Sequence, residues 1–294
     1  MGSPDKDRTL IKVEKLSVEY LRDDAKAGEA RGHRALTEVS FEIGRGETLG
    51  LMGESGCGKS TLALALLGLL PRERAHVTGS IAFDGQELVG LSERAFAEIR
   101  GARIAMIYQE PEIALSPFLR AGEQIAEVVH AHRDWNWKQC REAAFAALER
   151  MKFGDTQRIY RSYPHQLSGG QRQRVVFAQA LACEPELIVA DEPTASLDAR
   201  NQAEAVELLR EARRETGASL LLISHTPEIQ ASLADRLMVM SEGAIVEQGK
   251  FDELYWNPKH ACTRAMLRPS GRAAERMRKK HATGRGAEQE QLVR

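Results

Sequence analysis

The sequence of 294 residues is long enough for one large domain or two ordinary ones, and 43% of its residues are hydrophobic and 28% charged. This is the composition of an ordinary globular protein, and a formal net charge of −1 gives no argument for nucleic acid or an anionic membrane as a partner. The first eight residues are charged, unlike a signal peptide, and no apolar run reaches the length of a membrane span. The four cysteines form no C-x-x-C pair, which argues against a disulfide framework or zinc site and fits a reducing cytosol.

The first part of the chain predicts three strands. Residues 11–20 alternate between apolar and polar side chains, as in a half-buried strand, and residues 35–43 form a second candidate strand. Residues 22–34 are polar, charged and glycine-containing, which predicts a loop. A glycine turn then leads into a short, mostly apolar strand at residues 47–52.

A glycine-rich segment follows this third strand and precedes strong helix formers at residues 62–67. It matches G-x-x-x-x-G-K-[ST], the loop that wraps the phosphates of a nucleoside triphosphate, in the strand–loop–helix order that the motif needs. We expect Lys59 to reach the β- and γ-phosphates and the Ser60 hydroxyl to bind Mg²⁺. The helix N-terminus is also expected to lower the pKa of the Cys57 thiol and make it sensitive to alkylation. The motif predicts binding of ATP or GTP by this phosphate loop: Gly53, Glu54, Ser55, Gly56, Cys57, Gly58, Lys59, Ser60 and Thr61.

The amino-acid composition changes in the middle of the chain. A strand at residues 80–83 ends in the turn pair Asp84-Gly85, Ser92 can cap a helix to about residue 100, and residues 104–108 form a compact buried strand. From about residue 109 to about residue 172, alanine, glutamate, glutamine and arginine dominate with helical periodicity. We interpret this region as a mostly helical insert.

The second half returns to alternating strands and helices. Continuous apolar strands are expected at residues 187–190, 219–223 and 237–240, with a helix at residues 202–215 and a last strand at residues 244–248. Continuous apolar strands between helices imply a parallel sheet covered on both faces, and hence an α/β fold.

The last part of the chain, residues 269–294, loses the apolar pattern and is dominated by charged residues and glycine. We expect a charged, disordered tail. The alternative is a basic patch, residues 276–280, that binds anionic lipid.

Two carboxylates, Asp191 and Glu192, directly follow the buried strand at residues 187–190. The carboxyl end of a strand in such a fold faces the nucleotide, so Asp191 can hold Mg²⁺ and Glu192 can polarise the attacking water. The alternative is an ordinary acidic pair at a strand end, followed by the turn residue Pro193.

Residues 167–171, Leu-Ser-Gly-Gly-Gln, precede a helix that begins near Arg172. Ser168 can cap this helix, and Gly169 and Gly170 expose successive N–H groups where an anion could bind. One nucleotide cannot easily occupy both this surface and the phosphate loop of the same subunit. We therefore expect a head-to-tail dimer in which each surface completes the site of its partner.

With these motifs, the chain resembles the nucleotide-binding subunit of an ABC transporter over residues 8–268. Residues 167–171 match the family signature in full, between the two nucleotide motifs. The resemblance implies a P-loop NTPase core with an N-terminal antiparallel β part and the helical insert at about 109–172.

The resemblance also implies roles for individual residues. Tyr20 resembles the aromatic residue that stacks on adenine, although a strand-end tyrosine is the plain alternative. Gln109 resembles the glutamine that joins Mg²⁺ and the attacking water to the membrane subunit. The histidine after the strand at residues 219–223 resembles the switch histidine that contacts the γ-phosphate. This switch histidine is His225. Two further elements match the family: the signature residues Ser168, Gly169, Gly170 and Gln171, and the dimer-contacting loop Ser196, Leu197 and Asp198.

Within the superfamily, the chain is most similar to ATPases of the peptide and nickel uptake branch. The segments that carry this similarity are the phosphate loop and residues 109–111, 114–117, 122–125, 163–166, 257–260 and 263–267. The chain departs from the usual pattern at Thr226-Pro227, where aspartate usually follows the switch histidine, and at Ala261-Cys262, where Pro-Tyr is usual.

The resemblance implies an ATP- and Mg²⁺-dependent subunit that powers an importer, for peptides or a related small solute, from the cytoplasmic face of the inner membrane. The expected partners are a second ATPase subunit, identical or paralogous, two membrane permease subunits and, indirectly, a solute-binding protein, but no nucleic acid. The alternative is a soluble ABC ATPase that acts in repair, translation or cofactor assembly. An ATP-binding regulatory module without turnover is disfavoured because the hydrolysis residues are all present.

Overall fold

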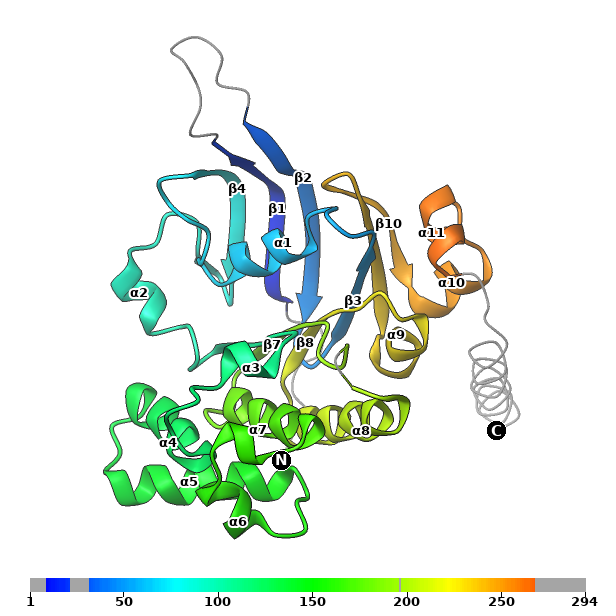
Figure 1. Ribbon diagram of the computed structural model, residues 1–294. Coiled ribbons are helices and arrows are strands. Elements are labelled where there is room, and N and C mark those ends of the chain that lie inside the picture. Colours follow the sequence, from blue (N-terminus) through cyan, green and yellow to red (C-terminus); the bar gives the residue numbers. More distant parts are fainter. Residues whose placement is uncertain (1–8, 22–31, 196, 268–294) are drawn as a thin grey trace, which may run out of the picture.

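The computed structural model of the protein describes residues 9–21, 32–195 and 197–267. The predicted tail, most of the predicted loop at residues 22–34 and Ser196 lie outside the described residues. The described chain builds two β-sheets with helices around them (Figure 1).

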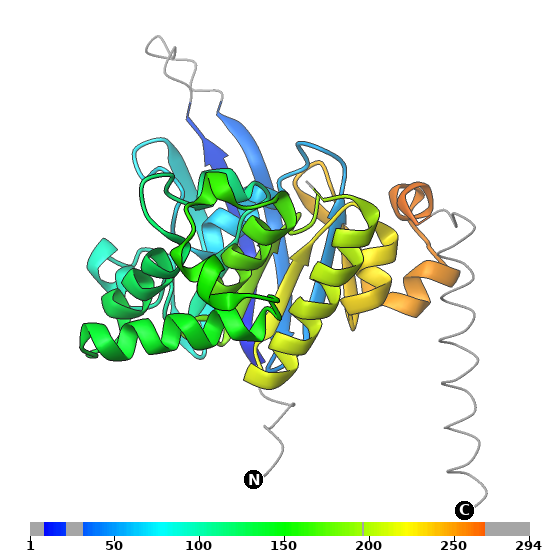
Figure 2. The same ribbon diagram turned by 60° about the horizontal axis from the view of Figure 1, so that its bottom comes forward.

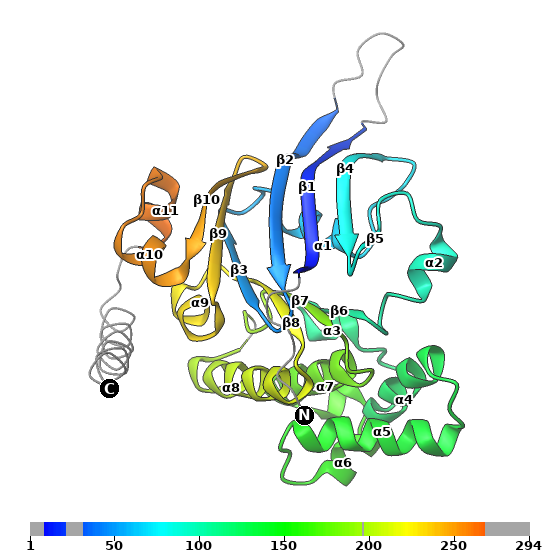
Figure 3. The same cartoon turned by 180° about the vertical axis from the view of Figure 1, so that it is seen from behind.

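The described residues form ten strands in the two sheets. A four-stranded antiparallel sheet has the order β2-β1-β4-β5, and Figure 3 shows these strands side by side. A six-stranded sheet has the order β10-β9-β3-β8-β7-β6, with only the β9–β10 pair antiparallel. The strands are β1 (Thr9–Tyr20), β2 (His33–Gly44), β3 (Thr48–Gly53), β4 (Ala75–Phe83), β5 (Gln86–Glu87), β6 (Ile104–Ile107), β7 (Leu187–Asp191), β8 (Ser219–Ile223), β9 (Arg236–Ser241) and β10 (Ala244–Lys250).

Most helices lie in the connections between strands, and α10 and α11 follow the last strand. The region predicted as a helical insert holds four helices and one 3₁₀ turn. The helices are α1 (Lys59–Leu66), α2 (Glu93–Ala97), α3 (Pro111–Ala114), α4 (Ala121–His132), α5 (Trp137–Arg150), α6 (Thr156–Arg161), η1 (Pro164–Gln166), α7 (Gly169–Leu181), α8 (Ala199–Thr216), α9 (Pro227–Leu233), α10 (Phe251–Trp256) and α11 (Ala261–Met266).

The six-stranded sheet is covered on both faces, as the continuous apolar strands predict. Alternate residues of β7 and β8 take part in two different buried clusters. Leu187 and Val189 belong to the cluster that includes α1 and the antiparallel sheet, whereas Ile188 and Ala190 belong to the cluster that includes α7 and α8. Figure 2 shows α7 and α8 lying across this second face.

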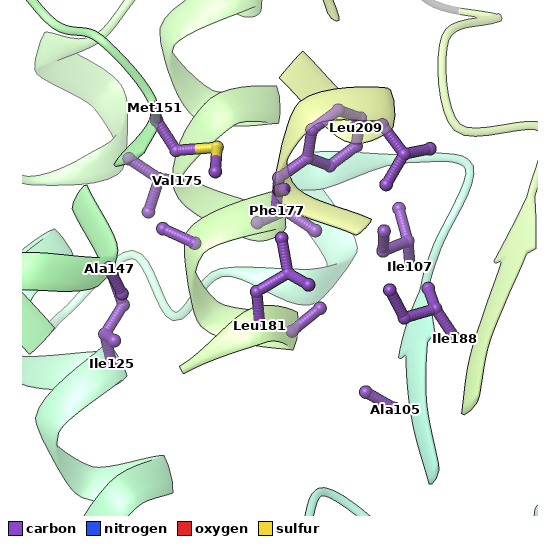
Figure 4. Packing of buried hydrophobic residues seen from close by; sticks show 14 of the residues in the cluster. Ala105, Ile107, Ile125, Ala147, Met151, Val175, Phe177, Leu181, Ile188 and Leu209 are labelled. Carbon is purple, nitrogen blue, oxygen red and sulfur yellow. The ribbon is translucent and has the colours of Figure 1, made fainter. Parts of the chain in front are cut away.

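Helix α7 joins the helical insert to the sheet through the core drawn in Figure 4. Phe177 is fully buried in this cluster. The cluster also contains Ile125 and Ala147 of the insert and Ile107 and Ile188 of the sheet. The insert therefore packs against the sheet through the helix that begins at the predicted signature.

Three short helices were not predicted. Helix α9 starts at Pro227, where the fixed φ of proline suits the first helical position. Helices α10 and α11 cover β9 and β10, and the Glu247 carboxylate accepts hydrogen bonds from the backbone N–H groups of Lys259 and His260, both at 2.9 Å. Glu247 and these two residues are 12 and 13 positions apart in the chain, so local sequence patterns do not predict the contacts.

No helix of the described segments is both long and apolar enough to cross a membrane.

An ion-pair ring (Arg45, Asp84, Arg103 and Glu186) connects the two sheets near the amino ends of β3, β6 and β7. Arg45 lies 2.8 Å from Glu186 and 2.6 Å from Asp84, and Arg103 lies 2.6 Å from Glu186 and 3.2 Å from Asp84. Burial alone would raise the pKa of Glu186, but the hydrogen bonds from the two arginines outweigh it and lower this pKa.

We predict that Glu186→Gln lowers the free energy of unfolding by about 1–2 kcal/mol at pH 7, because it removes two charge-assisted contacts. Because the pKa of Glu186 is lowered in the folded state, its contribution is fully present above the ordinary value and disappears as the pH falls through the lowered value. Urea unfolding between pH 7 and pH 3 measures both effects. Glu184→Gln is the matched control, since Glu184 is more exposed and has one arginine partner, and it should change stability by less than about 0.5 kcal/mol. Equal effects of the two substitutions would contradict the role of the ring.

Candidate nucleotide site

Strand register brings three polar segments to one edge of the six-stranded sheet. Ile223 of β8 pairs with Leu51 of β3 on one side and with Asp191 of β7 on the other. Because these strands are parallel, the chain leaves all three at the same edge. The phosphate loop, Glu192 and His225 follow within two residues of this register line.

A cavity of about 420 Å³ opens at this edge. The phosphate loop, β1, β2 and the ends of β7 and β8 contribute to it. The predicted site residues that line it are Tyr20, Gly53, Ser55, Gly56, Gly58, Lys59, Ser60, Thr61, Gln109, Asp191, Glu192 and His225.

The phosphate loop has the backbone that an anion site needs. Gly56 and Gly58 have φ values of 79° and 108°, which L side chains rarely adopt. A Cβ atom at Gly58 would also lie 2.5 Å from the Ala35 carbonyl oxygen. Gly58 is the N-cap of α1 and has no side chain, so it leaves the first N–H groups of the helix for a ligand.

Lys59 is held over the loop by backbone carbonyl groups. Its Nζ lies 2.8 Å from the carbonyl oxygens of both Gly53 and Glu54. These contacts keep the ammonium group at the cavity, where it can meet a phosphate. Glu54 is exposed and does not line the cavity, so its contribution is this carbonyl group.

Ser60 and Asp191 form a pair of oxygen donors at the cavity. The Ser60 hydroxyl donates to Asp191 Oδ2 at 3.1 Å. Burial raises the pKa of Asp191, the nearby Glu192 adds to this rise, and Ser60 and Lys59 oppose it. A carboxylate and a hydroxyl oxygen are ligands that suit a hard divalent cation, and its charge would counteract the effect of burial. The donor set therefore fits Mg²⁺.

Glu192 and His225 make two contacts through one carboxylate oxygen. The backbone N–H of His225 donates to Glu192 Oε1 at 2.9 Å, and the imidazole Nδ1 lies 2.7 Å from the same oxygen. The side chain of Glu192 is only 12% exposed, whereas that of His225 is 68% exposed. Glu192 has a φ of 46°, and this rare backbone conformation directs its side chain toward the end of β8.

The signature residues and Asp198 form a second surface that does not line the cavity. Ser168 caps α7 by accepting from the Gln171 N–H at 3.3 Å, and the Gln171 side chain accepts from the Ser168 N–H at 3.1 Å. Asp198 caps α8 and accepts from the Asn201 N–H at 3.0 Å; hydrogen bonds from Asn201 lower the pKa of this carboxyl. A Cβ atom at Gly170 would lie 3.2 Å from Asn201 Oδ1, so the two helix N-termini are neighbours.

The expectation for Cys57 was wrong. Its side chain is buried, and a Cβ atom at Gly53 would lie 2.4 Å from its sulfur atom. Burial raises the pKa of the Cys57 thiol, and the opposing effect of Lys59 is smaller. Proximity to a helix N-terminus did not decide this pKa, because the side chain turns under the loop.

Two residues that line the cavity, His33 and Ala35, were not predicted as site residues from the sequence. Both lie on β2, and His33 pairs with Tyr20 of β1 in the antiparallel register. Tyr20 in turn places its hydroxyl 3.4 Å from the Thr61 hydroxyl. The pairing of β1 and β2 was the missing information, since His33 and Ala35 carry no motif of their own.

The comparison with known protein families agrees with this geometry. Residues 36–195, more than half of the chain, match the family model described as ABC transporter. The chain belongs to the ABC transporter family. As an ABC ATPase it binds and hydrolyses ATP.

Several relatives of this ATPase have names that concern peptides. It is 44% identical over 241 residues to the probable peptide ABC transporter ATP-binding protein of Sinorhizobium fredii, which covers 82% of the chain and 72% of the relative. It is 41% identical to the oligopeptide transport ATP-binding protein OppD of Lactococcus lactis, over 80% of the chain and 70% of the relative. It is 39% identical to the dipeptide transport ATP-binding protein DppD of Bacillus subtilis, over 88% and 76%.

A solved structure confirms the predicted fold class. A dimeric, post-hydrolysis ATP-binding cassette bound to ADP and phosphate matches with a TM-score of 0.71 and 26% identity, over 82% of the chain and 98% of that structure. The P-loop core, the antiparallel β part and the helices between them are thus those of an ABC ATPase.

We predict that Lys59→Ala weakens ATP binding roughly 10- to 100-fold, the effect of losing a charge-assisted hydrogen bond to phosphate. Calorimetric titration with ATP measures this change. Lys12→Ala is the control, because Lys12 pairs with Glu14 on the surface and does not line the cavity. Unchanged affinity in Lys59→Ala would remove this residue from the nucleotide site.

Proposed function

We propose that the chain is the ATP-hydrolysing subunit of an importer for peptides or a related small solute. The observation that carries the chemistry is the pairing of Glu192 with His225 beside Lys59, Ser60 and Asp191 in one cavity. The peptide-transport names of the relatives support the solute class.

Different residues of the cavity would bind the phosphates, the base and Mg²⁺. The phosphate-loop N–H groups and Lys59 bind the phosphates, and Tyr20 supports the base. Ser60 and Asp191, with Gln109, which also lines the cavity, would hold Mg²⁺, which neutralises phosphate charge when bound.

Glu192 accepts a proton from the attacking water through its second carboxylate oxygen, Oε2. His225 holds the other oxygen and so fixes the direction of the carboxylate. The side chain of His225 is far more exposed than that of Glu192, so the imidazole ring can reach a γ-phosphate.

Two subunits would form the complete site. Ser168 to Gln171 and Asp198 lie outside the cavity on an exposed pair of helix N-termini, which suit the phosphates of a nucleotide held by a second, identical or paralogous, copy. The dimeric state of the related cassette supports this arrangement.

A second, more apolar cavity of about 310 Å³ is the proposed contact for a permease. It lies between β6, α4 and α7, and its lining includes Leu69, Met106, Tyr108 and Val128. Tyr108 directly precedes Gln109, so an occupant of this groove touches the segment that reaches the nucleotide cavity. We infer that, in each of two ATPase copies, this groove holds one helix of a membrane permease subunit at the cytoplasmic face of the inner membrane. A solute-binding protein would act through the two permeases.

We predict that Glu192→Gln retains ATP binding and lowers turnover roughly 10²- to 10⁴-fold, the usual scale for loss of a general base. Steady-state phosphate release and ATP titration measure the two properties separately. Glu184→Gln is the control, because Glu184 does not line the cavity. Near-normal turnover would remove Glu192 from the mechanism.

The importer itself is tested by capture of the tagged Glu192→Gln chain with ATP from detergent-solubilised native membranes. We expect two polytopic membrane proteins to be recovered, and Leu69→Asp to abolish their recovery. Leu21→Asp is the matched control, since Leu21 is also an exposed leucine but lies outside the groove. Recovery of soluble partners alone would favour a non-transport ABC ATPase and leave the hydrolysis chemistry intact.

A further inference from the structure

A glutamine side chain is fully buried directly behind the nucleotide site. Gln230 lies on α9 and has an exposed fraction of 0%. Its Nε2 atom lies 3.3 Å from the carbonyl oxygen of Leu51, 3.1 Å from that of Leu222 and 3.1 Å from that of Ser224. The amide has two N–H groups, so three carbonyl oxygens share two protons.

These three carbonyl groups belong to the strand ends that carry the site. Leu51 lies in β3, two residues before the phosphate loop begins, and Ser224 directly precedes His225. The backbone N–H of Ser224 also donates to the Leu51 carbonyl oxygen at 3.2 Å. The Gln230 amide therefore connects the end of β8 to the end of β3 at the point where His225 leaves the sheet.

The space around this amide is filled. A Cβ atom at Gly50 would lie 2.1 Å from Gln230 Oε1 and 2.9 Å from Gln230 Cδ. Gly50 is not among the glycines with a positive φ, so its small size, and not an unusual backbone, is what the position requires. The missing side chain of Gly50 thereby leaves the space that the Gln230 amide occupies.

His225 lies in a very short connection between two anchored elements. Only His225 and Thr226 separate Ser224 from Pro227, the first residue of α9. Gln230 follows one turn later and binds back to Ser224, which closes the segment into a loop. The backbone N–H of His225 contacts Glu192, and the position of this backbone thus depends on where α9 packs.

We propose that Gln230 is a positioning residue for ATP hydrolysis. It fixes the β8–α9 connection so that His225 keeps both its backbone and its ring contact with Glu192 Oε1. The proposal rests on the hydrolytic roles proposed above for Glu192 and His225, and it assigns to Gln230 an effect on turnover that acts through His225.

The test replaces the amide with an apolar side chain of similar size, in Gln230→Met. We expect kcat to fall about 10- to 100-fold, the scale of a misplaced catalytic group, while the dissociation constant for ATP changes less than twofold. We also expect the histidine-side-chain NMR signal that is absent in His225→Ala to shift in Gln230→Met. Gln124→Met is the matched control, because Gln124 is a buried glutamine whose amide also donates to backbone carbonyl groups, those of Ser116 and Leu119. It should leave kcat and the signal of His225 unchanged.

A second variant covers the case in which Gln230→Met does not fold. Gly50→Ala keeps the amide but forces Oε1 to move, and it should lower kcat and shift the His225 signal in the same direction. In the background of His225→Ala, either substitution should have less than a twofold further effect on the residual turnover.

The outcomes separate the two proposals. An unshifted His225 signal, or an equal loss of turnover with and without His225, would overturn the positioning role of Gln230. Normal turnover in His225→Ala would instead overturn the role of His225 in hydrolysis, while a shifted signal in Gln230→Met would still establish that Gln230 positions it.

Discussion

The site depends on the register of three parallel strands. Ile223 pairs with both Leu51 and Asp191, so the backbone hydrogen bonds of β3, β8 and β7 bring three separate parts of the chain to one edge. Each strand is short and buried on both faces, and a shift by one residue would exchange the side chains that it presents to two different buried clusters. The packing of α1 on one face and of α7 and α8 on the other therefore also fixes the distances among Lys59, Glu192 and His225.

Burial and charge act together at this edge. Asp191 is partly desolvated, and its contact with the Ser60 hydroxyl only partly offsets the resulting rise of its pKa. A divalent cation would stabilise the charged form, so metal binding and ionisation of this carboxyl are linked. Glu192 is nearly buried as well, but a neutral backbone N–H from His225 contacts its carboxylate, which orients it without adding a formal charge.

Much of this arrangement could be predicted from the sequence, because the phosphate loop, the Asp191-Glu192 pair and the signature are contiguous motifs. The strands that carry them were recognisable as continuous apolar runs. The contribution of His33 could not be predicted, since it depends on antiparallel pairing with Tyr20. Nor could the role proposed for Gln230, which needs the carbonyl groups of two strands and the missing side chain of Gly50. Short helices such as α11 escaped prediction because a distant carboxylate, not local periodicity, anchors them.

The cysteine that lies under the phosphate loop gives the protein an internal reporter. The Cys57 side chain is buried, its sulfur lies against Gly53, and Lys59 Nζ lies 3.8 Å from that sulfur, so opening of the loop would expose the thiol to a reagent. The rate of modification at Cys57 then measures how often the empty loop opens, and bound nucleotide should suppress it. Cys262, which is partly exposed on α11, provides a second thiol in the same chain against which that rate can be normalised.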